Sequence, residues 1–374
     1  MFLFLEIKML WKMKHIVVRG RNKVKKERLF YLDFIRAIAT ISIVMTHFNA
    51  RYLYLSPPMP EKAIVTTTVS NIYIGNWGVS LFFIISGAAL MYIYEDKCNW
   101  KEFYRKRFLS IYPMFWIAYS FAFLYLFYSD KRIPSSAVDV PKINIIFSCL
   151  GLDGLLVRNI PMFYILGEWF LGVIIIMYLI FPILRKLIIN YSYATVIGVI
   201  AVYLWMIFGF NFNFDRGTVI LTRLPEICFG MYYIRFRKRV NGKVAFLSLL
   251  ILVTNGLLKP TWSQDIQTTY VGIFSFLLLV YFSYYLERVV IKKVCGVISK
   301  YSYATFLVHH VVIERMMKTF NLMEISVLYS YILFIVVCVV VAFFAWLLYN
   351  VHDKIIKKIC YFYMEEIQRK KKTL

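Results

Sequence analysis

The sequence predicts an all-α protein, a polytopic membrane bundle of about ten transmembrane helices with both termini in the cytoplasm. Three observations predict this class. Of the 374 residues, 61% are hydrophobic and only 17% are charged, below the quarter that is typical of soluble domains, and the mean hydropathy is +0.66. Long apolar segments recur along the chain, and Lys and Arg lie in short clusters between them.

Ten segments are long and apolar enough to cross about 30 Å of hydrocarbon as helices. The sixth and ninth carry polar residues and give the weakest signal. The longest connection expected on the outer side, residues 130–160, is a candidate lid or docking surface. The ten segments lie near residues 30–50, 73–94, 108–129, 161–184, 192–210, 217–234, 244–260, 268–286, 296–316 and 326–350.

The Lys and Arg residues are distributed unevenly between the two sides. With the N-terminus inside, the cytoplasmic segments carry 32 of the 44, and the opposite loops carry 10. Cytoplasmic loops attract positive charge, so both termini are expected in the cytoplasm. We expect basic tails at residues 1–27 and 353–374 around a membrane domain at 28–352. The net charge of +24 therefore indicates membrane orientation, and no nucleic-acid partner is expected.

The six cysteines show neither CxxC nor Cys/His spacing, and several lie in apolar runs. The sequence therefore predicts free thiols, with no disulfide framework and no metal site.

The first apolar segment, LDFIRAIATISIVMTH, carries three ionisable residues. Eleven helical steps lead from Arg36 to His47, about 20° past three full turns, so both share one face about 16 Å apart along the axis. Asp33 precedes Arg36 by three residues and can pair with it on that face. Ionisable residues within a membrane usually mark function, although a purely structural role is the alternative.

Several later stretches also carry polar candidates. Ser86 and Gly87 fit a close-packing point between helices better than a nucleophile, because no GxSxG pattern or adjacent base accompanies the serine. Arg105, Lys106 and Arg107 suit either a membrane-edge anchor or the phosphates of an anionic cytosolic molecule.

Glu168 lies beside a tryptophan close to the outer leaflet. Arg223 and Glu226, spaced i, i+3, can neutralise each other within the membrane, which favours a structural role over a catalytic one. His309 and His310 stand in an apolar setting, and at most one of them is expected to face the bundle interior.

In this order, these stretches resemble the membrane-bound acyltransferase 3 family of bacterial O-acyltransferases. LDFIRA followed by His47 is similar to its opening motif, and GVSLFFIISGAAL is similar to its second-helix motif. RKRFLSIYP, GEWFLG, RLPEICFG and YSYATFLVH resemble its later elements, over about residues 28 to 315. The chain departs from the family where Ser110 replaces a second arginine three residues after Arg107. The extracytoplasmic esterase-like domain fused to some members is not expected here.

The resemblance implies transfer of an acyl group, most often acetyl, from cytosolic acyl-CoA to a hydroxyl of a cell-surface or lipid-linked glycan. It implies a multi-pass protein of the bacterial plasma membrane. Its partners would be membrane lipid, the glycan acceptor and acyl-CoA, with no permanently bound cofactor. The rival hypothesis is a glycan transporter or flippase, but the sequence shows neither a duplicated half nor a matched pair of broken helices.

On this reading, His47 is the general base for the acceptor hydroxyl or a transient acyl carrier. Arg36 orients the donor or stabilises negative charge in the transition state, and Asp33 holds Arg36 in place. Glu168 and His309 are secondary candidates for acceptor binding or proton handling. The cations that would bind the donor's phosphates are Arg105, Lys106 and Arg107.

Overall fold

The computed structural model describes residues 26–372 apart from residues 138, 167, 210–215 and 237–238, with the side chains of residues 168 and 359–372 also excluded. Most of the expected N-terminal tail therefore lies outside the described residues. The long helices are α2 (Phe30–Leu53), α3 (Ile74–Tyr94), α4 (Trp100–Asp130), α7 (Glu168–Asn190), α8 (Ser192–Phe208), α9 (Ile220–Phe236), α10 (Gly242–Leu258), α11 (Gln264–Leu286), α12 (Val289–Lys318) and α13 (Val327–Lys372).

Short elements occupy the connections. They are η2 (Pro60–Lys62), β1 (Thr68–Val69), β2 (Ile72–Tyr73), η3 (Lys142–Asn144), α5 (Ile145–Cys149), α6 (Asp153–Leu156) and η4 (Arg216–Thr218). The two strands form an antiparallel hairpin whose turn residues Ser70 and Asn71 both have positive φ, the backbone that tight hairpin turns require. The all-α prediction does not include these two short strands.

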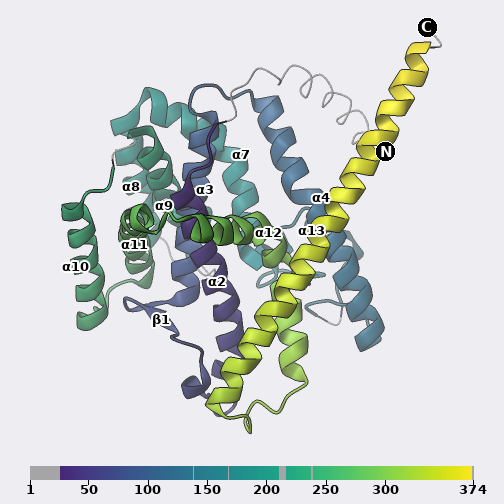
Figure 1. The fold of residues 1–374 in the computed structure, drawn as a ribbon, viewed down its shortest axis with the longest axis horizontal. Helices are drawn as coiled ribbons and strands as arrows, with labels where there is room; N and C mark the ends of the chain where they lie inside the picture. Colours follow the sequence, from purple (N-terminus) through teal and green to yellow (C-terminus); the bar gives the residue numbers. More distant parts are fainter. Residues whose placement is uncertain (1–25, 138, 167, 210–215, 237–238, 373–374) are drawn as a thin grey trace.

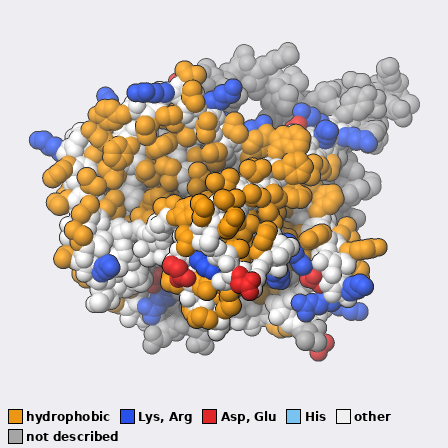
Figure 2. Space-filling model, turned by 60° about the horizontal axis from the view of Figure 1, so that its bottom comes forward, with side chains coloured by type: hydrophobic (Ala, Val, Ile, Leu, Met, Phe, Trp, Pro, Cys, Tyr) orange, Lys and Arg blue, Asp and Glu red, His pale blue; other side chains and the backbone are white. Residues whose placement is uncertain are grey.

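Each of the ten expected apolar segments coincides with a long helix, so the prediction of a helical bundle is confirmed. Within the described part of the chain, six helices are long and apolar enough to cross a membrane, namely α2, α3, α4, α7, α11 and α13, whereas α8 and α10 are shorter apolar helices. Hydrophobic side chains cover most of the face in Figure 2, with many Lys and Arg side chains toward its margins. The number of spans and the sides of the termini stay predictions.

Some helix boundaries differ from the expected ones. The fourth expected segment began at 161, but α7 begins only at Glu168. The third began at 108, but α4 begins at Trp100, where the Asn99 side chain accepts the Glu102 backbone N–H at 3.0 Å, a typical helix N-cap. At the other end of the chain, α13 continues without a break to Lys372 and projects beyond the other helices (Figure 1).

Helices α2 and α3 lie at the centre of the bundle (Figure 1). Helix α3 packs against α9, α2 and α11, and α2 lies between α3 and α12. One buried apolar cluster joins α2, α3, α7, α9 and α11. A second joins α2 to α12 and α13, and a third joins α4, α7, α12 and α13. Because α2 belongs to two of these clusters, its polar residues are held inside the bundle.

The segment between α4 and α7, where residues 130–160 are expected to form an outer-side lid or docking surface, is mostly exposed and is anchored to both helices, and its role stays a prediction. The Trp116 indole N–H on α4 donates to the Cys149 carbonyl at 2.8 Å, and the Tyr112 hydroxyl donates to the Leu150 carbonyl at 3.1 Å. Gly151, with a φ of +70°, lies against the Leu171 side chain of α7. Helices α5 and α6 are thus packed along α4 and α7, because aromatic donors on α4 bind the segment's carbonyls.

Small residues bring α3 and α9 into close contact. A Cβ atom added at Gly87 of α3 would lie 2.1 Å from the Ile227 carbonyl oxygen, and one added at Gly230 of α9 would lie 2.0 Å from the Ile84 carbonyl oxygen. Each glycine therefore faces the backbone of the opposite helix. The expectation that Gly87 is a packing point is confirmed.

Gly230→Ala is expected to destabilise the protein by about 1–3 kcal/mol, because the new methyl group forces α3 and α9 apart. Thermal unfolding of the purified protein in detergent would measure this. Gly198→Ala on α8 is the matched control, since a Cβ there meets nothing within 4 Å and alanine favours a helix over glycine. A Gly230→Ala protein as stable as the wild type would contradict the close-packing argument.

Candidate active site between helices α2 and α12

A cluster of charged and hydroxyl side chains lies where the first turns of α2 face α12. Ser299 of α12 donates its hydroxyl to Asp33 Oδ1 at 2.7 Å and accepts from Arg36 Nη1 at 3.1 Å. Asp33 Oδ1 and Arg36 Nη1 are 4.0 Å apart, at the limit of an ion pair. The closer ionic partner of Asp33 is Arg28, whose Nη2 donates to Oδ1 at 2.9 Å. The predicted pairing of Asp33 with Arg36 is therefore mediated mainly by Ser299.

Three histidines meet at the other end of the same interface. The ring centroid of His47 lies 4.8 Å from that of His309 and 5.2 Å from that of His310. Both α12 histidines therefore approach α2, but only His309 is buried, in agreement with the expectation that at most one of them faces the bundle interior. The side chains of adjacent helical residues point about 100° apart, and the His47 ring lies where both His309 and His310 can reach it. His310 was not among the predicted site residues, although the paired histidines were visible in the sequence.

The tautomer of His309 follows from its backbone contacts. Its Nδ1 lies 2.8 Å from the Phe306 carbonyl oxygen and 3.2 Å from that of Thr305. A carbonyl only accepts, so Nδ1 carries the hydrogen. The neutral ring then has its lone pair on Nε2, and the fully buried His309 side chain is held in one orientation.

The sequence prediction of a shared face is confirmed by these contacts. Arg36 and His47 both reach α12 side chains, Arg36 through Ser299 and His47 through His309. The rise of a helix separates them by about 16 Å along the α2 axis. The interface of α2 and α12 thus carries two polar clusters, guanidinium groups with Asp33 and Ser299 at one end and imidazoles at the other, and we call the two clusters together the polar path.

The three predicted cations on α4 differ in their surroundings. Lys106 is paired with Glu102 at 2.6 Å near the surface. The Arg107 guanidinium lies over the Tyr178 ring of α7, 5.5 Å from the ring centroid. The Nε atoms of Arg105 and Arg107 are buried with no hydrogen-bond partner in the described part of the chain. Arg107 therefore lies at the interface of α4 and α7.

Ser110 does not replace the missing arginine. It is exposed, and its hydroxyl donates to the Arg107 carbonyl of its own helix at 2.9 Å. Glu168 begins α7, but its side chain lies outside the described residues, so its predicted role stays a prediction.

Arg223 and Glu226 form a buried pair apart from this path. Arg223 Nη1 and Glu226 Oε1 are 3.3 Å apart, with side-chain exposures of 3% and 0%. Arg223 Nε also donates to the Gly217 carbonyl at 2.8 Å, and its guanidinium lies 5.8 Å from the Phe83 ring centroid on α3. The predicted i, i+3 pair is present, and its contacts on the α3 side of the bundle favour the structural role.

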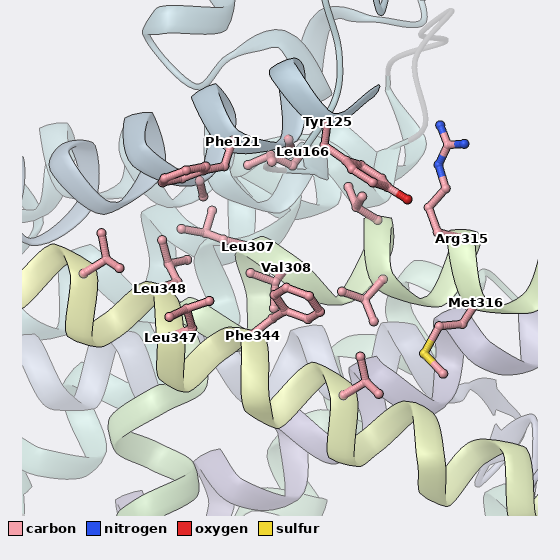
Figure 3. Close-up of a pocket in the computed structure, with 16 residues that line it drawn as sticks. Phe121, Tyr125, Leu166, Leu307, Val308, Arg315, Met316, Phe344, Leu347 and Leu348 are labelled. Atoms are coloured by element: carbon pink, nitrogen blue, oxygen red, sulfur yellow. The ribbon is translucent and has the colours of Figure 1, made fainter. Parts of the chain in front are cut away.

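An apolar groove of about 680 Å³ lies between α4, α12 and α13 (Figure 3). On α12, Leu307 and Val311 line it, and Arg315 stands at one end (Figure 3), where its Nη2 pairs with Asp130 Oδ2 at 2.6 Å. The histidines of α12 face α2 instead, so α12 separates the groove from the polar path.

Neither a metal centre nor a disulfide is formed by the described residues. Among them, no group of three or more His, Cys, Asp or Glu side chains is arranged to hold a metal ion. The cysteines with described side chains are free thiols, as expected. The prediction that the protein needs no metal stays a prediction.

Comparisons with known proteins give a family match and a similar relative. The profile of a family described as "Acyltransferase domain", the acyltransferase 3 family, matches residues 29–350. Acyltransferase MdmB of Streptomyces mycarofaciens is 25% identical over 166 residues, which cover 43% of this chain and 40% of that protein. No solved structure matches the chain significantly. Since the family profile spans both helices of the polar path and nearly the whole described bundle, the chain belongs to the acyltransferase 3 family.

Proposed function

We propose that this protein is a membrane O-acyltransferase of the bacterial plasma membrane. It moves an acyl group, acetyl in the first instance, from cytosolic acyl-CoA to a hydroxyl of a cell-surface or lipid-linked glycan. The observation that carries the proposal is the polar path between α2 and α12, which places Arg36 at one end and three histidines at the other. Family membership supports acyl transfer as the reaction.

The donor binds at the guanidinium end of the path. Buried guanidinium nitrogens without partners attract anions, and arginine grips phosphate through paired N–H groups. Arg105 and Arg107 have such Nε atoms, and the Arg107 guanidinium lies over the Tyr178 ring of α7. Lys106 is already paired with Glu102, so it contributes mainly positive charge at the edge of the donor site. The phosphates of acyl-CoA then lie near α4 while the thioester enters the path.

The chemistry takes place at the histidine end. His47 accepts the proton of the acceptor hydroxyl as its oxygen attacks the thioester carbonyl carbon. The carbon–sulfur bond breaks, the ester forms, and His47 returns the proton to the departing thiolate of CoA. His309, held by the Phe306 carbonyl, supports the His47 ring from α12. A transient acyl group on His47 is the alternative route, and both routes require the same imidazole.

The apolar groove supports membrane lipid as a further partner. Its lining is hydrocarbon except at the Arg315 end, and lipid chains surround helices of this composition. This protein needs no bound cofactor for the proposed reaction, because the donor itself supplies the activated acyl group.

Deleting the gene in its host is expected to remove O-acyl esters from one envelope glycan while the amount of that glycan stays normal. The ester content, released by mild base and quantified, and the glycan yield are the two measurements. Complementation with the intact gene is the control. Loss of the surface glycan itself, with normal ester content in what remains, would contradict the enzyme and indicate a transporter.

A further inference from the structure

We infer that Ser299 of α12 is a positioning residue that sets the Arg36 guanidinium for the acyl donor. The inference rests on the proposed function, in which Arg36 meets the donor. Ser299 is buried and bridges two charged side chains of another helix. A hydroxyl in that position connects α12 to the polar path through two hydrogen bonds.

The direction of the hydrogen bonds is fixed by their chemistry. A carboxylate accepts only, so the single hydroxyl hydrogen of Ser299 goes to Asp33 at 2.7 Å. The Ser299 oxygen then has lone pairs for the Arg36 N–H group at 3.1 Å. Each bond has one charged partner, and such bonds are shorter and stronger than neutral ones. The chain from carboxylate to hydroxyl to guanidinium therefore has one orientation.

Asp33 cannot position Arg36 without this bridge. Its Oδ1 lies 4.0 Å from Arg36 Nη1, too far for a good hydrogen bond. Its carboxylate is also bound by Arg28 at both oxygens, and the Arg28 side chain is 60% exposed. Without the hydroxyl, the long Arg36 side chain loses its nearest described acceptor and regains rotameric freedom. The donor would then have to order it on binding.

Ser299→Ala is expected to weaken the binding of acetyl-CoA by roughly tenfold, the effect of losing a hydrogen bond to a charged group and leaving buried charge under-satisfied. Equilibrium binding of radiolabelled acetyl-CoA to the full-length protein in detergent would measure it. Ser299→Thr keeps a hydroxyl on the same helix and is expected to bind acetyl-CoA within about threefold of wild type.

Ser302→Ala is the matched control. Ser302 lies one turn further along α12, and its hydroxyl donates to the Ser299 carbonyl at 3.0 Å, with no hydrogen bond to Asp33 or Arg36 among the described contacts. This variant is expected to bind acetyl-CoA as the wild type does. The melting temperature of each variant separates loss of the bridge from loss of the fold, because a purely structural role would lower stability without a selective change in acetyl-CoA affinity.

The outcomes separate this inference from the proposed function. If the wild type binds acetyl-CoA and Ser299→Ala binds it equally well, the positioning role is overturned. Equal losses in Ser299→Ala and Ser302→Ala, or a Ser299→Thr protein as weak as Ser299→Ala, would overturn it as well. A wild type that does not bind acetyl-CoA would instead overturn the proposed donor, and the inference with it.

Discussion

His47→Ala is expected to abolish acyl transfer while the protein still folds and inserts. A positioned general base contributes about 10²–10⁴-fold to rate, and a transient acyl carrier would contribute at least as much. The imidazole is only partly buried, and α2 is held by two apolar clusters that do not depend on it. The measurement is the O-acyl ester content of the glycan in a deletion strain carrying the variant gene, alongside the amount of protein in the membrane.

The control for this prediction is His352→Ala. His352 lies on α13, and none of the described ring contacts joins it to the His47 cluster, so this variant should restore esters to the wild-type level. His309→Ala is expected to give an ester content between those of His47→Ala and His352→Ala, because His309 contacts the His47 ring without being the assigned base. Full ester content with His47→Ala, at normal protein level, would remove His47 from the mechanism.

The sequence predicted the parts of the site that one helix contains. The spacing of Arg36 and His47 is a property of α2 alone, so helical periodicity was sufficient to place them on one face. The i, i+3 spacing of Arg223 and Glu226 predicted their pairing for the same reason. The approximate extents of the long helices also followed from continuous apolar runs, whose length the bilayer determines.

Features that depend on packing between helices could not be predicted in this way. Ser299 is 266 residues from Asp33 in sequence, and no local pattern shows that α12 lies against α2. Arg28 precedes α2, so the helical periodicity of α2 does not predict that Arg28 competes with Arg36 for Asp33. The anchoring of residues 149 and 150 depends on Tyr112 and Trp116 of α4, which bind their carbonyls more than thirty residues away. Family resemblance gave the order of the motifs but not these contacts.

Glu226→Ala is expected to be among the most destabilising single substitutions in the bundle, at about 3–5 kcal/mol. The Arg223 guanidinium is 3% exposed, and removal of its carboxylate partner leaves a positive charge in an apolar interior. The remaining hydrogen bond to the Gly217 carbonyl and the contact with the Phe83 ring offset only part of that cost. Thermal unfolding in detergent and the yield of folded protein would both fall.

Two further variants test whether the charge is responsible. In Arg223→Met/Glu226→Leu both charges are replaced by apolar groups of similar size, so this protein is expected to be more stable than Glu226→Ala. Asp353→Ala removes one partner of an exposed pair with Lys357, 2.6 Å apart, in which Asp353 is 43% and Lys357 74% exposed. This variant should cost less than about 1 kcal/mol. If the double variant is less stable than Glu226→Ala, the pair stabilises the bundle through its geometry and hydrogen bonding. An uncompensated charge is then not the cause of the stability loss in Glu226→Ala.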